Sequence, residues 1–405
     1  MESELQVAID IGSRVHRVAV GDADGHILDQ FDVRHTARGM DAFFTRIELL
    51  PHETVAVAME GYNGWARPLD QRILAHGWKL FNVNNLKLAR YKEIFPAPAK
   101  SDNIDSLRML ELFRMRQSLH VARDVLQRVI AAPPENDKLK QLTRRRRQLV
   151  NDKVRLIARM GTMLQALCPG LLELTGAVDN TWFLSLLTAR ADVRKLPGLR
   201  GTTLCSLPGI GKKYAALIKT WQHEALLADD ADWTGPMLIA DANRLLTLKY
   251  EIEGLERQIA PLSDQSELAR RLASIPGFGL VCTAELAGEI GDLARYEGES
   301  GLAVYMGMAP LTNSSGMFQG CKRPRQVNRH AKFAMMTAAA RHLELVPQSR
   351  HYYAKKRAEG KKHNQAVRCI GRQLVRIIWS MVKHGRDYEV ASMEKETHES
   401  DSCQA

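Results

Sequence analysis

Four carboxylates in the first quarter of the chain have the residue types and spacing of a metal-binding site. Asp10 stands within the apolar segment VAIDIGS, Glu60 ends the apolar run TVAVAME, and Asp102 and Asp105 are three residues apart in KSDNIDSLRML. On a helical turn the last two would face the same way, with Cβ atoms about 5–6 Å apart. Carboxylates among apolar strand residues are costly to bury unless a cation compensates them. Four of them at a sheet edge could hold two Mg²⁺ ions about 3.5–4 Å apart, as in-line phosphoryl transfer requires.

A purely structural interpretation of these carboxylates remains open. Asp102 could cap a helix, and Glu60 could lie in a surface turn. Asp10 and Glu60 are harder to explain in this way, because both stand at strand positions. We therefore predict that Asp10, Glu60, Asp102 and Asp105 are catalytic and that they bind Mg²⁺, with two ions per site.

A second candidate site lies in the segment 307–333, at the step Ser315-Gly316. A Ser-Gly step alone is usually only a turn. This one has many basic residues after it, and guanidinium groups can stabilise the negative charge that develops when a serine attacks a DNA phosphate. Ser315 is the candidate nucleophile, with the adjacent Ser314 as an alternative. The basic residues expected to bind nucleic acid here are Lys322, Arg323, Arg325, Arg329 and Lys332.

The positive charge of the chain is clustered. Its formal net charge is +11, and residues 320–386 contain 17 Lys and Arg against Glu344 and Glu359, a net charge of +15. Clustering favours a polyanion partner over a charge that serves only solubility. A second cluster in the middle of the chain predicts a second nucleic-acid surface, used for RNA; it consists of Arg144, Arg145, Arg146 and Arg147.

The elements that would position these residues change along the chain. We expect strands between residues 5 and 34, a helix near 38–50, strands at 54–60 and 78–83, and helices from about 85 to 115. Strands followed by alternating helices and strands predict an α/β domain with a mixed sheet.

The middle of the chain has the pattern of long helices. Leu142, Leu149, Leu156 and Met163 recur every seven residues, and apolar residues between 245 and 262 alternate three and four apart. This is the spacing of a coiled-coil seam, which could bring a second chain alongside. Because three heptads are few, packing inside one domain is the alternative.

Two segments repeat the pattern S-apolar-P-G-apolar-G before a helix: CSLPGIGKKYAALI at 205–218 and ASIPGFGLVCTAEL at 273–286. Helix-hairpin-helix DNA contacts use such turns, because the exposed helix N-terminus suits a phosphate oxygen. Lys212 and Lys213 make the first copy the better candidate. A plain turn between two helices would use the same residues.

Several classes of protein and site are not indicated. The six cysteines are widely spaced without a CxxC pair, which argues against a zinc site or a disulfide framework. There is no run of 18 apolar residues, so we expect no membrane span. The acidic start runs straight into a strand, which leaves no room for a signal peptide and predicts a cytoplasmic protein. The polar segment 389–405 is expected to be disordered.

Together these motifs resemble the insertion-sequence family one-ten of transposases, which are recombinases guided by a bridge RNA. The resemblance covers nearly the whole chain. It rests on the four carboxylates with Lys100 before the aspartate pair, on SIPGFG (274–279), and on YMGMAPLTNSSG (305–316) with the basic stretch after it. The sequence departs from the family at Ser13, at Ser106 and in VNRHAKF (327–333), which lacks the usual glycine.

The resemblance implies an RNase H-like domain, similar to the bacterial Holliday-junction resolvase, then coiled-coil helices and an α-rich transposase domain. It implies a catalytic serine, matched by Ser315, that links covalently to DNA. We place the carboxylate domain at 1–120, the helical linking region at 121–235, and the transposase domain at 236–388.

The predicted function is site-specific recombination that excises and inserts a mobile element. Its partners would be donor and target DNA, a structured guide RNA, and further copies of the chain in a dimer or tetramer. Two alternatives remain: a structure-specific junction endonuclease that uses only the carboxylates, and a non-catalytic nucleic-acid-binding protein.

Overall fold

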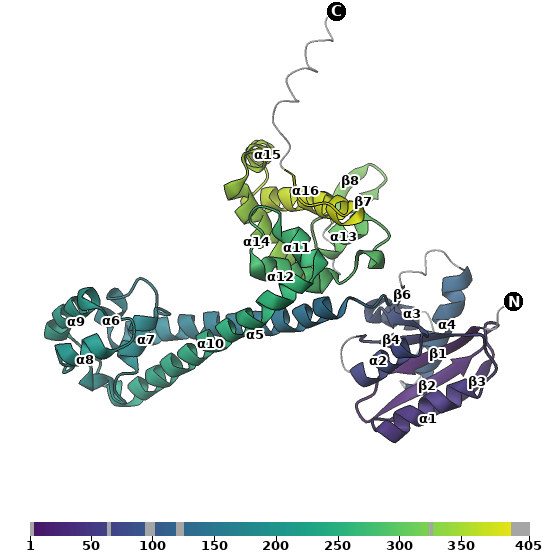
Figure 1. Cartoon of the computed structure of the whole chain (residues 1–405), viewed down its shortest axis with the longest axis horizontal. Coiled ribbons are helices and arrows are strands. Elements are labelled where there is room, and N and C mark those ends of the chain that lie inside the picture. The colour runs from purple at the N-terminus through teal and green to yellow at the C-terminus, as the bar shows by residue number, and fades with distance from the viewer. Residues whose placement is uncertain are drawn as a thin grey trace, which may run out of the picture. The chain divides into compact units, whose positions relative to one another are not determined.

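The computed structural model describes residues 4–62, 66–93, 102–118, 125–322, 324 and 327–389. The chain forms two compact units, Met1–Ala131 and Ala132–Ala405 (Figure 1). No helix in the described part of the chain is long and apolar enough to cross a membrane.

The first unit is built on a six-stranded mixed sheet with the order β3-β2-β1-β4-β5-β6. Strands β1, β2 and β3 form an antiparallel meander, whereas β4 and β5 run parallel to β1 and β6 is antiparallel to β5. The mixed sheet followed by a helical region is consistent with an RNase H-like fold. The strands are β1 (Glu4–Asp10), β2 (Val15–Gly21), β3 (Ile27–Arg34), β4 (Thr54–Glu60), β5 (Lys79–Val83) and β6 (Leu126–Arg128).

Helices cover both faces of this sheet. On one face, α1 (Ala37–Glu48) and α2 (Arg67–Ala75) pack on Leu5, Val7 and Ile9 of β1. On the other face, α3 (Asn85–Lys92) and α4 (Asp102–Ser118) pack on Ala8 and on alanines of the neighbouring strands. Because successive strand residues point to opposite faces, the large apolar residues of β1 face α1 and its small ones face α4.

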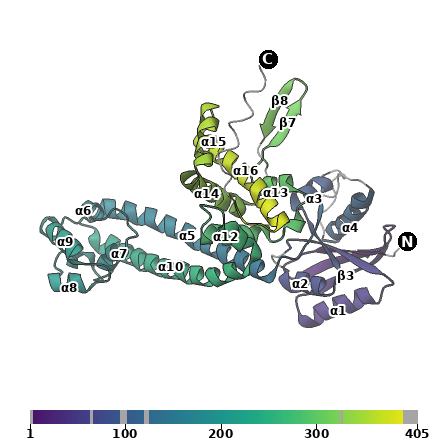
Figure 2. The same cartoon turned by 45° about the horizontal axis from the view of Figure 1, so that its top comes forward.

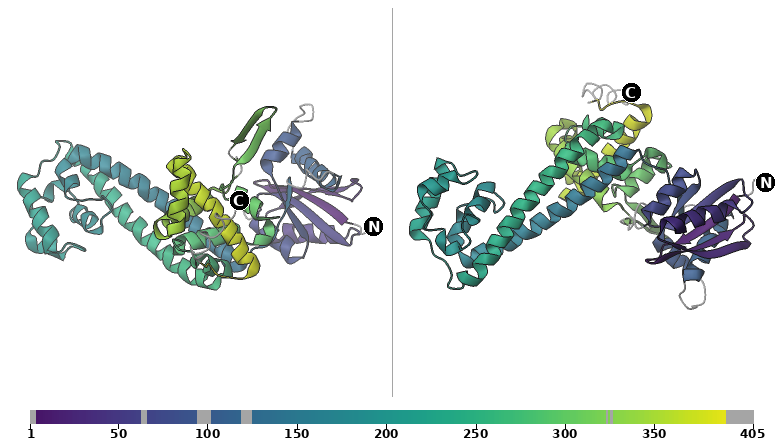
Figure 3. Two further views of the ribbon diagram at one scale, coloured as in Figure 1. Left: turned by 90° about the horizontal axis from the view of Figure 1, so that it is seen from above. Right: turned by 60° about the horizontal axis from the view of Figure 1, so that its bottom comes forward.

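The second unit contains two long helices, α5 (Pro134–Leu167) and α10 (Ala231–Gln265), which lie side by side (Figures 1 and 3). Leu149 and Leu156 of α5 share a buried core with Leu245 and Leu248 of α10. The heptad residues of the two helices therefore pack on each other within one chain, and they do not form an exposed seam for a second chain. The chain segment that connects the two helices contains α6 (Pro169–Glu173), α7 (Thr181–Leu187), η2 (Val193–Lys195), α8 (Gly201–Ser206) and α9 (Lys212–Glu224).

The rest of the second unit is a helical domain with one β-hairpin, which Figure 2 shows extending from the helices. Its core joins all the longer helices of this region and the ends of α5 and α10 nearest to it. The hairpin strands β7 (Leu311–Ser315) and β8 (Phe318–Lys322) are antiparallel. The helices are α11 (Glu267–Ala273), α12 (Leu280–Ile290), η3 (Leu293–Arg295), α13 (Glu299–Tyr305), α14 (Arg329–Leu345), α15 (Pro347–Ala358) and α16 (His363–His384).

Both copies of the repeated glycine pattern form a tight turn between two helices. Gly209, between α8 and α9, and Gly277, between α11 and α12, have φ values of +78° and +87°. A Cβ at Gly277 would lie 2.5 Å from the backbone nitrogen of His342, so neither the backbone conformation nor the space suits another residue. The turn geometry is as expected from the sequence, while phosphate binding at it stays a prediction.

Candidate active site

Asp10 and Glu60 lie beside each other where two parallel strands end. Ile9 of β1 is paired with Met59 of β4, so each carboxylate is the next residue at the carboxyl end of its strand. The strand alternation puts Asp10 on the same face as Ala8, and Glu60 on the same face as Ala58. This is the face covered by α3 and α4, so both carboxylates are directed toward those helices.

Asp105 joins them from α4. It lies one turn before Met109 and two turns before Leu112, which pack on the sheet, so it belongs to the face of α4 that meets β1. Its side chain is 17% exposed, and its Oδ1 lies 2.7 Å from Nζ of Lys92 in α3. Asp102 begins α4 three residues earlier. The side chain of Asp102 and the whole of Lys100 lie outside the described residues.

The electrostatics of Glu60 show that the three carboxylates form one group. Burial raises the pKa of Glu60, and the negative charges of Asp10 and Asp105 raise it further, against the opposing charge of Lys92. Its Oε2 also accepts a hydrogen bond of 2.9 Å from Nδ2 of Asn85. An excess of negative charge at a sheet edge is what a divalent cation would relieve.

Lys92 and Asn85 were missed by sequence reasoning. Both are in α3, which starts two residues after β5 and therefore lies at the same edge of the sheet as the ends of β1 and β4. The short connection between strand and helix was a usable signal, because it leaves the start of α3 next to the strand ends.

Another acidic group lies elsewhere in the first unit. Ligand atoms of Asp22, Asp24 and His26 all lie within 4.8 Å of one another in the turn between β2 and β3; Asp10, Glu60 and Asp105 do not meet this criterion. Asp22 already accepts hydrogen bonds from the backbone nitrogen and Nδ1 of His26, at 2.8 and 2.9 Å. These hydrogen bonds stabilise the exposed turn, so a structural role accounts for the acidic group without a metal ion.

Ser315 is the last residue of β7, at the tip of the hairpin rather than in an irregular loop. It is exposed, it is paired in register with Phe318, and Gly316 after it has a φ of +55°. Lys322 is exposed at the end of β8, and Arg329 is exposed at the start of α14. Lys332 is half-buried, with its aliphatic stem against Gly307. Arg323 and Arg325 lie outside the described residues.

Two family models match this chain. One, described as a transposase, matches residues 7–169, and the other, described as a transposase of the IS116/IS110/IS902 family, matches residues 269–354. The first range includes all four carboxylates, and the second includes Ser315. The chain belongs to the IS116/IS110/IS902 family of transposases.

Two relatives of the transposase are similar to it over nearly its whole length, and another is similar over about a third of it. The insertion element IS116 uncharacterized 44.8 kDa protein of Streptomyces clavuligerus is 28% identical and covers 94% of this chain and 95% of its own. The insertion element IS900 uncharacterized 42 kDa protein of Mycobacterium paratuberculosis is 26% identical, over 97% of this chain and 99% of its own. The transposase for insertion sequence element IS1111A of Coxiella burnetii is 22% identical over 36% of this chain and 41% of its own. The family resemblance drawn from the motifs is thereby confirmed.

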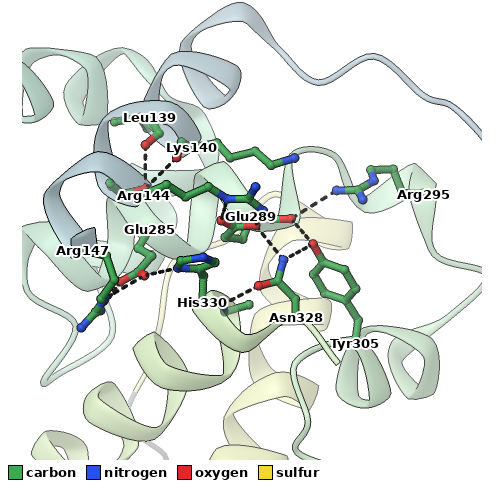
Figure 4. A network of polar contacts seen from close by, with 12 residues as sticks. Leu139, Lys140, Arg144, Arg147, Glu285, Glu289, Arg295, Tyr305, Asn328 and His330 are labelled. Atoms are coloured by element: carbon green, nitrogen blue, oxygen red, sulfur yellow. Dashed lines mark hydrogen bonds and ion pairs between the residues drawn. The ribbon is translucent and has the colours of Figure 1, made fainter. Parts of the chain in front are cut away.

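Three of the four arginines that were predicted to bind nucleic acid in α5 form ion pairs within the chain. Nε and Nη2 of Arg144 donate to the two carboxylate oxygens of Glu289, at 2.6 and 2.8 Å (Figure 4). Nη2 of Arg147 lies 2.5 Å from Oε2 of Glu285. Both glutamates belong to α12, and each is at most 1% exposed.

Three of the four arginines thus have acidic partners within the chain, which account for their presence without a bound nucleic acid. Arg146 is paired with Glu256 of α10 at 2.6 Å, whereas Arg145 is exposed. Burial alone would raise the pKa of Glu289, but the hydrogen bonds and charge of Arg144, helped by Asn328 and Lys140, outweigh it and hold that pKa below its usual value. Arg144 and Arg147 therefore neutralise buried acids, and Arg145 is the member best placed for a polyanion.

A stability measurement tests this assignment. Arg144→Ala should lower the free energy of unfolding by about 3 kcal/mol, because it removes the cation bound to the buried Glu289 and leaves that carboxylate the hydrogen bond from Asn328. The loss lies at the low end for a buried pair because Arg144 is itself partly exposed. Arg145→Ala, the matched control, should change it by less than about 0.5 kcal/mol. Denaturant unfolding of the two variants gives both values. Equal stabilities would show that the Arg144–Glu289 pair does not contribute to the fold.

The raised pKa of Glu60 predicts how the transposase responds to pH. A carboxyl group whose pKa is higher in the folded state destabilises the fold when ionised, so its effect is absent below the ordinary pKa and appears as pH rises through the raised one. In metal-free buffer at neutral pH, Glu60→Gln should therefore raise the unfolding temperature by a few degrees. Below the ordinary glutamate pKa the variant should match the wild type. Glu48→Gln, at an exposed helix end, is the control and should show no such pH-dependent gain.

Proposed function

We propose that this transposase excises and inserts its element by cutting and rejoining DNA with a metal-binding carboxylate site and a nucleophilic serine. The observation that carries the proposal is the convergence of Asp10, Glu60 and Asp105 at one edge of the first sheet. The relatives named above come from insertion elements, which supports a DNA substrate. In this assignment residues 1–120 hold the carboxylates, 121–235 form the linking region, which is helical after strand β6 of the first sheet, and 236–388 carry the serine. The predicted tail at 389–405 lies, apart from its first residue, outside the described residues.

The residues at the sheet edge fit Mg²⁺. Asp10, Glu60 and Asp105 would hold it together with Asp102, since carboxylate oxygens are the ligands this ion prefers. Burial, together with the charges of Asp10 and Asp105, raises the pKa of Glu60, and the Lys92 ammonium beside Asp105 opposes this increase. A bound cation would offset the same negative charge. When bound, Mg²⁺ would stabilise the negative charge that develops on the phosphoryl oxygens.

Ser315 would act as the nucleophile on the phosphodiester. Its Oγ loses its proton and bonds to phosphorus, while the sugar oxygen that leaves takes up a proton. Attack by a hydroxyl of another strand on this phosphoserine reverses the step, joins the new strands and restores the serine. The exposure of Ser315 at the hairpin tip gives a phosphate free access to Oγ. Lys322 and Arg329 are the described cations nearest to it along the chain, and such groups stabilise the charge of the attacked phosphate.

Guidance by a structured RNA is part of the proposal. It is supported by exposed basic residues far from Ser315 in the sequence, namely Arg145, Lys212 and Lys213. Assembly into a dimer or tetramer would hold the several strands of a recombination event together. The heptad residues are packed within the chain, so such an assembly would use other surfaces.

The test is recombination in vitro between a plasmid that carries the element ends and one that carries a target. The purified chain, Mg²⁺ and the non-coding RNA of the element should together give junction products, and omitting any of the three should remove them. Cleavage of branched DNA without joining would instead support a junction endonuclease. Binding without any cleavage would support a non-catalytic protein.

A further inference from the structure

A cavity of about 330 Å³ lies at the foot of the hairpin that carries Ser315. Pro310, which precedes β7, and Pro324, which follows β8, both line it, so the two ends of the hairpin border the cavity. The other walls come from the segment before the hairpin and from helices α14, α15 and α16. A volume near 300 Å³ is at the lower end of the range for small-molecule sites and is large enough for one nucleotide.

The walls divide into an apolar side and a cationic side. Met308, Ala309 and Val327 supply apolar surface, and Tyr352 adds an aromatic ring. The described lining residues include four basic side chains and no Asp or Glu. These basic residues are Lys332, Lys361, Arg368 and Arg372. A cavity with one apolar and one cationic side fits a ligand with a flat ring system and a negative charge.

Two of these cations are already paired with acids of the chain. Nζ of Lys361 lies 2.7 Å from Oε2 of Glu359, and Nη2 of Arg372 donates to Glu299 at 3.2 Å. Arg368 differs, because its Nε is buried and no group among the described residues accepts a hydrogen bond from it. A buried donor without an acceptor is unfavourable, so an anion bound in the cavity would stabilise this side chain.

We propose that this cavity takes one nucleotide of the cleaved DNA strand, a few steps from the cleavage position, with its base extruded from the stack. The base would lie against Met308 and Tyr352, and Arg368 would bind its phosphate through the planar guanidinium. This inference rests on the proposed role of Ser315. From Leu311 to Ser315 the strand spans about 13 Å, or roughly four nucleotide steps of B-form DNA. The bound nucleotide would therefore lie about four steps from the attacked phosphate.

Cys369 provides a direct probe of the cavity. It is a half-buried free thiol that lines the cavity. The full chain would be alkylated with N-ethylmaleimide in the presence of a single-stranded DNA of about 12 nucleotides and mixed sequence. Peptide mapping by mass spectrometry then gives the rate at each cysteine. An abasic strand with the same number of phosphates is the second ligand.

We expect the DNA strand to slow alkylation of Cys369. The abasic strand should need an about tenfold higher concentration for the same protection, since the base supplies the apolar contact. Arg368→Met should weaken protection about tenfold by removing the phosphate contact. Arg376→Met is the matched control, because it removes the same charge from α16 outside the cavity. The DNA strand should protect Cys369 of this variant as well as it protects Cys369 of the wild type.

Several results would overturn the inference. These are equal protection by the normal and abasic strands, equal behaviour of the two arginine variants, and absence of any protection. Stronger protection by an RNA strand of the same sequence would overturn the assignment to DNA. If Arg368→Met does not fold, the comparison of the two strands on the wild type still decides. The assay needs no cleavage and should give the same result with Ser315→Ala, so its failure is distinguishable from failure of the proposed chemistry.

Discussion

Asp10→Asn and Glu60→Gln should each reduce DNA strand cleavage by the transposase at least about a hundred- to a thousandfold, with the fold retained. Each change keeps the shape of the side chain and removes one negative charge from the group formed with Asp105. Mg²⁺ held by fewer carboxylates would stabilise the phosphoryl oxygens less well. Cleavage of a plasmid that carries the element ends measures the effect, and circular dichroism checks the fold.

A matched variant separates the sheet edge from the other acidic group. Asp24→Asn makes the same chemical change in the exposed turn that also contains Asp22 and His26. It should cleave DNA as the wild type does, because that turn is explained by its own hydrogen bonds. Loss of cleavage in Asp24→Asn together with full activity in Asp10→Asn would move the metal site to the turn.

Ser315→Ala should lower recombination by about a thousandfold or more, since removal of a nucleophile eliminates the covalent route. Ser314→Ala is the control. The two serines are consecutive in β7, so their side chains point to opposite faces of the hairpin and only one of them can take the same position toward a bound phosphate. Ser314→Ala should therefore keep most of the activity. A loss confined to Ser314→Ala would assign the nucleophile to the neighbouring residue.

The first unit was largely predictable because local pattern and tertiary structure agree there. The strand predicted at 54–60 is β4, with the same bounds, and the helix predicted near 38–50 is α1, whose buried residues recur at helical spacing at Met40, Phe43, Phe44 and Ile47. The expected closeness of Asp10 and Glu60 follows from parallel strands that end together. Lys92 was not predictable from pattern, because its contact with Asp105 depends on how α3 and α4 meet.

The second unit was harder to predict because its decisive contacts join distant parts of the sequence. Arg144 and Glu289 are 145 residues apart, and a run of four arginines carries no sign that three of them meet buried or partly buried acids. The heptad spacing predicted two long helices but could not tell whether their partner is the same chain or another. The hairpin was missed because its strands are short, polar and largely exposed, so they lack the alternation that identifies a half-buried strand.

The most direct test of the proposed chemistry is to isolate the covalent protein–DNA intermediate. The transposase would be incubated with DNA that carries the element ends, the RNA of the element and Mg²⁺, then denatured, digested and mapped by mass spectrometry. The account predicts a nucleotide linked to Ser315 in the wild type, and none in Ser315→Ala, in Asp10→Asn or in the presence of a chelator. Recombination that proceeds with no adduct on Ser315, or with an undiminished adduct in Asp10→Asn, would contradict it.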